Sequence, residues 1–189
     1  MTAPAVFERI VRSLDSLEVP YMLTGSLASS YHAVPRATQD VDLVIAPTRQ
    51  QLQQLVKALP VSEYYADETA ALEAYDTESL FNVIDLATGW KIDFIIRKSR
   101  PFSRLEFERR RRVDFEGSQL FIATAEDVVL SKLEWAKLGA SQRQIEDAAA
   151  ILRIRADEIE LPYIEKWVVE LQLQTEWNAA RQRAGVGPG

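Results

Sequence analysis

Residues 40 to 46 read DVDLVIA, a mostly apolar segment that begins with two aspartates one residue apart. Alternation followed by an apolar run predicts a mostly buried β-strand. Side chains two positions apart share a face of a strand, so Asp40 and Asp42 point the same way, roughly 6.5 to 7 Å apart. Any fold of this chain must therefore compensate two like charges at the margin of its core.

The segments around this strand predict an α/β domain. Residues 1–18 have apolar positions on helical spacing, and YMLTG at 21–25 reads as a short strand. Residues 26–34 predict a short helix that ends before Pro35, and residues 48–59 predict an amphipathic helix. Residues 61–78 fit either a helix or a loop.

Two hairpins follow. Residues 81–96, FNVIDLATGWKIDFII, predict two strands around a turn that contains Gly89. In the second strand Ile92 and Phe94 form an apolar face, which leaves Asp93 on the other face. If this strand is a neighbour of DVDLVIA, about 4.8 Å away, three carboxylates converge. Residues 112–123 predict a second hairpin.

The character of the sequence changes to helices at Thr124. Thr124 with Asp127 has the spacing of a capping box, as has Ser141 with Gln144, and Gly139 is suited to end the first helix. Two more amphipathic segments follow. We therefore expect a mixed sheet flanked by helices in residues 1–123 and a C-terminal helical bundle in residues 124–189. The three tryptophans in these helices, Trp135, Trp167 and Trp177, are interpreted as core residues.

The composition excludes several classes of site. The chain has no cysteine, which removes disulfides, thiolate chemistry and cysteine-based zinc sites. Its single histidine, His32, excludes a multi-histidine metal site and is interpreted as structural. With a formal net charge of −6, nucleic acid could be bound only through a local basic patch. No apolar run approaches the roughly 18 residues of a membrane span, and no signal-peptide core is present, so we expect a cytoplasmic protein without a membrane partner.

A cluster of three carboxylates needs a cation, and Mg²⁺ is suited to it because it binds one or two carboxylates together with substrate phosphates. Two such ions about 4 Å apart can hold both the attacking and the leaving oxygen of a phosphoryl displacement. Upstream, Gly25 allows a close backbone approach, and Ser26 opens a helix whose free N–H groups attract phosphate. The Walker pattern of P-loop proteins is missing.

The order Gly-Ser, thirteen residues, D-V-D and a later strand aspartate resembles the nucleotidyltransferase superfamily, whose palm fold is shared with DNA polymerase β. The fuller string GSLASSYHAVPRATQDVDLVI, with EDVVLSKLEW and RQIEDAAAIL downstream, resembles the AbiEii-like branch, which contains toxin components of toxin–antitoxin pairs. The resemblance covers roughly residues 20–155.

The resemblance implies a role for each matching residue. Gly25 and Ser26 would hold the triphosphate, and Asp40 and Asp42 would bind Mg²⁺. Asp93 would complete the metal site or act as general base toward the acceptor hydroxyl. Lys132 matches a family lysine that contacts nucleotide phosphates, and Arg36 matches a family arginine that would contact phosphate or pair with an aspartate. Arg143 and Asp147 match more loosely and are weaker candidates.

The implied function is a Mg²⁺-dependent transfer of a nucleoside monophosphate from an NTP donor, with two Mg²⁺ ions and Mn²⁺ as an alternative metal. The acceptor would be RNA, such as a tRNA end, or a protein hydroxyl, and an antitoxin would be a partner. The alternatives are a small-molecule acceptor, as in antibiotic nucleotidyltransferases, and an inactive module that binds nucleotide or a protein partner.

Each residue also has a simpler interpretation. The aspartates of D-V-D could pair with Arg36 or Lys91. A loop at 87–89 would place Asp85 opposite Lys91 across the first hairpin, which would leave Asp93 free. Arg143 and Asp147 have the spacing of a surface ion pair. The run ERRRR at 108–112 is either a solvated face or a patch for RNA phosphates.

Overall fold

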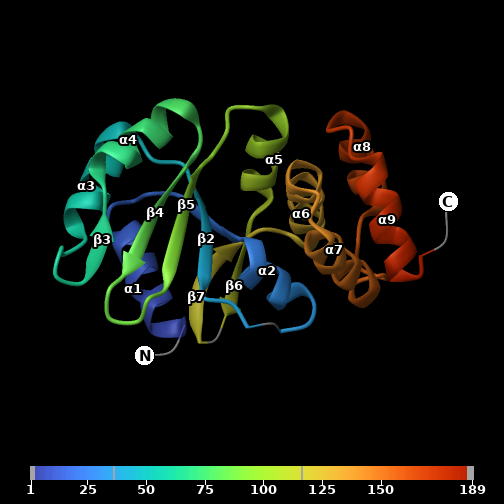
Figure 1. The fold of residues 1–189 in the computed structure, drawn as a ribbon, viewed down its shortest axis with the longest axis horizontal. Coiled ribbons are helices and arrows are strands. Elements are labelled where there is room, and N and C mark those ends of the chain that lie inside the picture. The colour runs from blue at the N-terminus through green and yellow to red at the C-terminus, as the bar shows by residue number, and fades with distance from the viewer. Residues whose placement is uncertain (1–2, 36, 116, 187–189) are drawn as a thin grey trace. The chain divides into compact units, whose positions relative to one another are not determined.

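The computed structural model describes residues 3–35, 37–115 and 117–186 (Figure 1). The chain divides into two compact units. The first comprises residues up to 27 and residues 37–122, and the second comprises residues 28–36 and those from 123 onward. In the described part of the chain, no helix combines the length and apolar character that crossing a membrane requires.

The first unit is built on a mixed sheet with helices around it. Its strands, in the described residues, are β1 (Tyr21–Thr24), β2 (Asp40–Ile45), β3 (Tyr64–Ala66), β4 (Leu80–Asp85), β5 (Lys91–Ile96), β6 (Arg111–Phe115) and β7 (Ser118–Ile122). They lie in the order β3-β4-β5-β2-β1-β7-β6. Strand β2 is parallel to β5 and antiparallel to β1, while β1 is parallel to β7. The mixed sheet flanked by helices that the sequence predicts is therefore confirmed.

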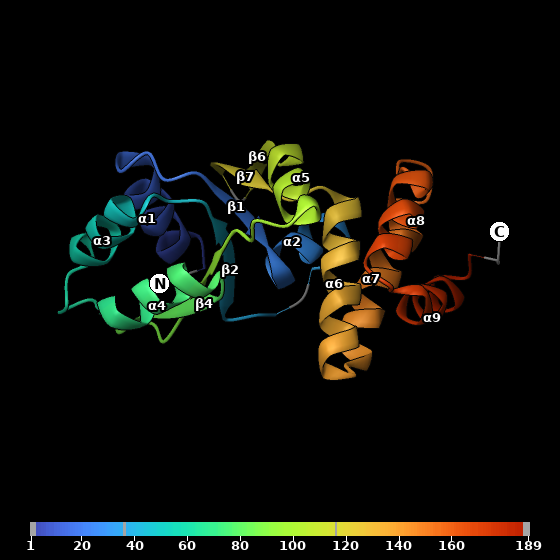
Figure 2. The same ribbon diagram turned by 90° about the horizontal axis from the view of Figure 1, so that it is seen from above.

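The helices of the first unit are α1 (Ala3–Ser16), α3 (Arg49–Ala58), α4 (Glu68–Thr77) and α5 (Pro101–Arg109). Helices α1, α3 and α4 form one neighbouring group (Figure 2). Residues 61–78 contain α4, and the side chain of Asp67 caps its N-terminus. The helix interpretation of that segment is therefore correct, and the loop interpretation is wrong. The sequence patterns did not predict α5.

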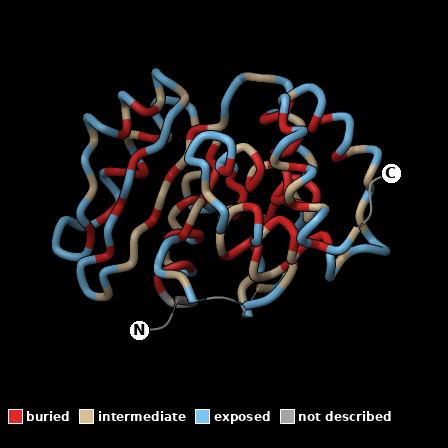
Figure 3. Tube along the Cα trace, turned by 45° about the vertical axis from the view of Figure 1, so that its right-hand side comes forward, coloured by how far each residue is buried: buried red, intermediate tan, exposed pale blue. Residues whose placement is uncertain are grey.

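One face of the sheet carries the core of the first unit. In β4 and β5 alternate residues are buried, and in β2 burial alternates over the first four residues before a buried end. Phe81 stacks on Phe94 with ring centroids 5.2 Å apart. Figure 3 shows how buried, intermediate and exposed residues are interspersed along the chain. The other face of the same strands carries Asp42 and Asp93, which are only partly buried. The predicted separation of an apolar face from an aspartate face is thus present.

The sequence prediction that Asp85 lies opposite Lys91 across the first hairpin is wrong. The partner of Lys91 on β4 is Ile84, one residue earlier, so Asp85 points into the core and is fully buried. There its carboxylate binds the guanidinium of Arg9 and accepts hydrogen bonds from the backbone N–H and hydroxyl of Thr88. The hairpin loop is longer than the sequence interpretation assumed, and this shift of one residue gives Lys91 different partners.

The second unit is helical. Helix α2 (Gly25–His32) begins in the first unit and ends in the second, which also contains α6 (Ala125–Gly139), α7 (Gln142–Ile154), α8 (Leu161–Glu170) and α9 (Gln174–Ala184). His32 has the structural role expected of it, because its Nε2 lies 2.8 Å from the carbonyl oxygen of Ala123.

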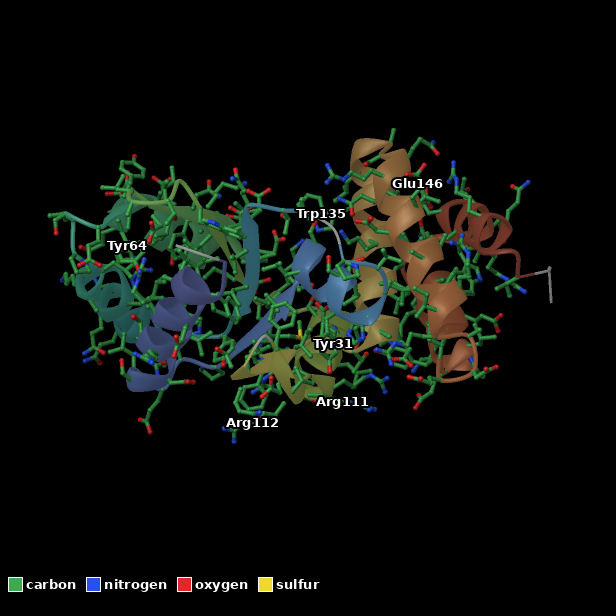
Figure 4. All side chains as sticks on the ribbon, turned by 90° about the horizontal axis from the view of Figure 1, so that it is seen from below. Tyr31, Tyr64, Arg111, Arg112, Trp135 and Glu146 are labelled. Carbon is green, nitrogen blue, oxygen red and sulfur yellow. The ribbon has the colours of Figure 1, made fainter. Side chains whose placement is uncertain are left out.

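Several details of this unit differ from the sequence interpretation. Gly139 is the last residue of α6, and Ala140 takes the left-handed cap conformation instead. Ser141 precedes α7 but makes no capping hydrogen bond through its side chain. Trp167 and Trp177 are buried as expected, whereas Trp135 is half exposed and is not a core residue (Figure 4).

Candidate functional site

A row of polar residues crosses four neighbouring strands on the face opposite the core. Asp42 of β2 is paired with Thr24 of β1 on one side and with Asp93 of β5 on the other. Asp93 is in turn paired with Asn82 of β4, whose amide donates a hydrogen bond to the Asp93 carboxylate. Because paired residues lie on the same face of a sheet, these four side chains form one line across it.

Gly25 is fitted closely to Asp42. It directly follows β1 and starts α2 with a φ of +63°. A Cβ atom built on Gly25 would lie 2.7 Å from the Cβ of Asp42 and still closer to its carboxylate. Only glycine therefore satisfies both the positive φ and the contact. This contact holds the Asp42 side chain against the first turn of α2.

Lys91 lies among the aspartates of this face. Its Nζ is 3.0 Å from Oδ2 of Asp93 and 3.7 Å from Oδ1 of Asp40, the residue with which it is paired between β2 and β5. The hydrogen bond to Asp93 raises the pKa of Lys91 above its ordinary value, and the charges of Asp93, Asp40 and Asp42 act in the same direction against partial desolvation. An ammonium group thus supplies the positive charge that the carboxylates require.

The residues of this face fit Mg²⁺ in chemistry and backbone placement. Carboxylate oxygens are the ligands that Mg²⁺ prefers, and the pairing of Asp42 with Asp93 brings two of them onto adjacent strands. The side chains do not form a finished cage, because no group of three acidic or histidine residues in the described ranges is arranged as a metal site. Lys91 lies between Asp40 and Asp93, so a metal ion bound by all three aspartates would have to displace its ammonium.

The other predicted nucleotide ligands are distributed over both units. Ser26 is the second residue of α2, directly after Gly25 and next to the aspartate face. Arg36 lies outside the described residues. Lys132 belongs to the second unit, where it is buried and its Nζ lies 2.9 Å from Oδ2 of Asp147. Arg143 is exposed. The roles of these residues as ligands stay predictions.

Sequence reasoning missed one member of the site, Asn82, and left the partner of Lys91 open between two alternatives. Asn82 is an exposed polar residue in an alternating strand, which has no signal of its own until the register of β4 and β5 is known. Lys91 was expected to pair either with the aspartates of D-V-D or with Asp85, and the structure shows it beside Asp40 and Asp93. The sequence could have located Asn82 only with the correct loop length.

Comparison with solved structures identifies the fold. The chain is similar to an antigenic nucleotidyltransferase-like protein from Paracoccidioides brasiliensis, with 18% identity, a TM-score of 0.56, and 93% of this chain and 91% of the other covered. It is also similar to the antibiotic-resistance factor ANT(2'')-Ia, with 11% identity, a TM-score of 0.56 and 97% of both chains covered. A complex of ANT(2'')-Ia with adenylyl-2''-tobramycin matches at 14% identity, a TM-score of 0.53, and 95% and 97% coverage of this chain and the other.

No family model and no curated protein sequence matches the chain. At these identities the similarity establishes a nucleotidyltransferase-like fold, as the sequence predicts, and leaves the activity to be argued from the residues.

The fit between Gly25 and Asp42 gives a first prediction. We expect Gly25→Ala to lower the free energy of unfolding by about 2 to 4 kcal/mol, because the new Cβ adds a steric clash to the cost of a positive φ. The matched control is Gly89→Ala, since Gly89 has a φ of +73° but no atom within 4 Å of the added Cβ. It should cost only about 1 kcal/mol. Denaturant unfolding of both variants measures the difference, and equal losses would contradict a specific contact with Asp42.

The position of Lys91 gives a second prediction. Without metal, Lys91→Met should lower stability by at most about 1 kcal/mol, because the lost ion pairs are partly exposed. With Mg²⁺ the same variant should show a larger gain in Tm than the wild type, because no ammonium competes for the carboxylates. Without metal, the difference in unfolding free energy between the wild type and Lys91→Met should be constant from pH 7 to 9, since the raised pKa of Lys91 keeps it charged there.

Lys57→Met is the control for this experiment, because Lys57 forms an ion pair with Glu68 away from the aspartates. Its response to Mg²⁺ should equal that of the wild type. If Lys91→Met also responded like the wild type, Lys91 and the metal would not compete.

Proposed function

We propose that this protein is a Mg²⁺-dependent nucleotidyltransferase, which transfers a nucleoside monophosphate from an NTP to an acceptor hydroxyl. The observation that carries the proposal is the placement of Asp42 opposite Asp93 on parallel strands, beside the Gly25–Ser26 turn. The nucleotidyltransferase-like fold supports it independently. An arrangement that served only the fold would have no need of three carboxylates on a partly exposed face.

Each residue of the site has a role in this proposal. Asp40, Asp42 and Asp93 would hold Mg²⁺, or Mn²⁺ in its place, and the metal when bound would neutralise charge on the transferring phosphate. The backbone N–H groups at the start of α2, from Gly25 and Ser26, would bind the donor phosphates. Asp93, oriented by the amide of Asn82, would accept the proton of the acceptor hydroxyl if it is not fully engaged with metal.

The roles of Arg36, Lys132, Arg143 and Asp147 are carried over from the family resemblance alone. Lys132 and Arg36 would contact donor phosphates. For Lys132 this requires that its ion pair with Asp147 opens or is shared with the nucleotide.

For the acceptor we propose RNA, such as a tRNA end, or a protein hydroxyl, in an AbiEii-like toxin that has an antitoxin partner. The support is the resemblance of the GSLASSYHAVPRATQDVDLVI and EDVVLSKLEW strings. A small-molecule acceptor is the second candidate, and it is favoured by the similarity to ANT(2'')-Ia, a solved complex of which contains adenylyl-2''-tobramycin. The two candidates share the donor site, so they differ only in the group that receives the nucleotide.

Thermal unfolding with each NTP, with and without Mg²⁺, tests the donor site. An NTP at a hundred times its Kd should add about 2.7 kcal/mol of stability, which corresponds to roughly 5 to 10 °C in Tm for a chain of this size. The shift should require Mg²⁺ and should be lost in Asp42→Asn. Without ligand, Asp42→Asn should be as stable as the wild type or slightly more stable, because one of three neighbouring negative charges is removed.

Transfer of labelled NTP then identifies the acceptor. Incorporation into total RNA or protein would support the first candidate, and modification of an aminoglycoside would support the second. A rise in Tm with NTP, without any release of pyrophosphate, would support the inactive nucleotide-binding module. No Mg²⁺-dependent shift with any NTP would contradict the proposed function.

A further inference from the structure

Positive charge is concentrated in one segment of this acidic chain. The formal net charge is −6, yet the sixteen residues 97–112 contain eight of its 22 lysines and arginines and only two glutamates. The segment comprises the residues after β5, helix α5 and the start of β6, all within the first unit. Its last two arginines, Arg111 and Arg112, extend from β6, an edge strand of the sheet (Figure 4).

Two arginines of this segment share one aromatic ring. The guanidinium carbon of Arg110 lies 4.2 Å from the centroid of Phe107, and that of Arg97 lies 5.5 Å from the same centroid. Arg110 also lies 5.1 Å from the ring of Phe121. The contacts of the two guanidiniums are with rings and with one carbonyl oxygen, that of Phe107, which accepts from Arg110. Among the residues that the structure describes, neither guanidinium has a carboxylate partner.

The charge of this pair is poorly compensated. The Nε atoms of Arg97 and Arg110 are buried and have no hydrogen-bond acceptor within the described part of the chain. Burial lowers the pKa of Arg110 from its ordinary value, and the nearby charge of Arg97 lowers it further. Two cations held together on one ring repel each other, and the repulsion is stronger where water is partly excluded.

A third arginine completes the cluster. Arg112 is paired with Phe121 across β6 and β7, which places it on the same face as that ring. Phe121 packs edge-to-face against Tyr21, with centroids 5.9 Å apart. Burial first, and then the charge of Asp15, raise the pKa of Tyr21 to about 12, against the opposing influence of Arg112 and Arg110. Tyr21 is therefore a neutral hydrogen-bonding group beside the two arginines.

We propose that Arg97, Arg110 and Arg112 form a phosphate-binding site on the first unit, separate from the aspartates. Arginine presents a planar set of donors that matches phosphate oxygens, and stacking on Phe107 holds two of these sets in place before a ligand arrives. A bound phosphate supplies the negative charge that the cluster lacks. Exposed arginines that merely cover an aromatic ring would not gain from an added anion.

The site lies apart from the donor site. Arg97 follows Asp93 by four residues on a line that continues β5, since the Arg97 N–H still bonds to the Ile45 carbonyl, so their Cα atoms are roughly 13 Å apart. The proposal needs no metal and does not rest on the proposed function. A phosphate group could come from a free nucleotide or pyrophosphate, or from the backbone of RNA.

Thermal unfolding with pyrophosphate in EDTA tests the site, and all proteins carry Asp42→Asn to silence the donor site. Pyrophosphate should raise Tm relative to sodium chloride at the same ionic strength. Arg97→Met and Arg110→Met should each lose most of this shift, measured from the Tm of the same variant without anion. Arg104→Met is the control, because it removes an exposed positive charge from the same segment outside the cluster. It should retain the shift.

A second readout separates the site from simple charge effects. Without anion, Arg97→Met should be at least as stable as the parent, because it relieves the repulsion with Arg110 and keeps an apolar stem on Phe107. The proposal is overturned if pyrophosphate stabilises all variants equally, or if it stabilises none. Failure of the NTP experiment above would leave this result unaffected, since it uses neither metal nor Asp42.

Binding of a labelled single-stranded RNA, measured in EDTA over a range of salt, distinguishes the two sources of phosphate. If the ligand is an RNA backbone, Arg97→Met should reduce the slope of log K against log salt by about 0.7, the loss of one phosphate contact, whereas Arg104→Met should not. RNA affinity that is equal in all variants, together with a pyrophosphate shift that is lost in Arg97→Met, identifies a small phosphate ligand. Equal responses of all variants to both probes overturn the site.

Discussion

The parallel pairing of β2 with β5 determines whether this protein has a site at all. It places Asp42 opposite Asp93 and Asp40 opposite Lys91, while Leu43 and Phe94 face the core. Because side chains alternate with a period of two, a slip of one residue would turn the aspartates into the core and the apolar residues outward. The buried residues of both strands therefore fix the register, and the register fixes the site. The apolar core of the first unit and its polar row are two consequences of one pairing.

The aspartate face is stable because each negative charge has a specific counterpart. Lys91 bridges Asp93 and Asp40, Asn82 donates to Asp93, and Asp42 is held against the start of α2. Three aspartates and one lysine still leave a formal charge of −2, on a face that is partly exposed. A divalent cation would complete the neutralisation, and Lys91 stands where it would bind. The carboxylates that attract the ammonium of Lys91 would attract a metal ion in the same way, and the metal ion would have to displace Lys91.

The sequence predicted the individual strands and helices better than the register in which the strands pair. The alternation in DVDLVIA and KIDFII identified both strands and the face of each aspartate, because burial on one side leaves a periodic signal. The partner of Lys91 on β4 depended on the length of the loop at residues 86–90, which their sequence does not specify, and an error of one residue placed Asp85 opposite Lys91 where the structure has Ile84. The sequence did not predict helix α5, because its few buried residues, Phe102 and Phe107 among them, lie between charged residues and give no clear apolar periodicity. The hydrogen bond of Asn82 to Asp93 depends on the pairing of β4 with β5, which no pattern within β4 predicts.

The distribution of charge along β5 is what both proposed phosphate sites of this acidic chain depend on. At the Asp93 end of this strand a triphosphate would meet net negative charge, so Coulomb repulsion would oppose its binding in the absence of a metal ion. At the Arg97 end the guanidiniums of Arg97 and Arg110 lack carboxylate partners among the described residues, and a phosphate would meet positive charge without a metal. The net charge of −6 describes neither end. The proposed donor site would therefore require a metal ion beside the aspartates, whereas the proposed phosphate site beside the arginines would not.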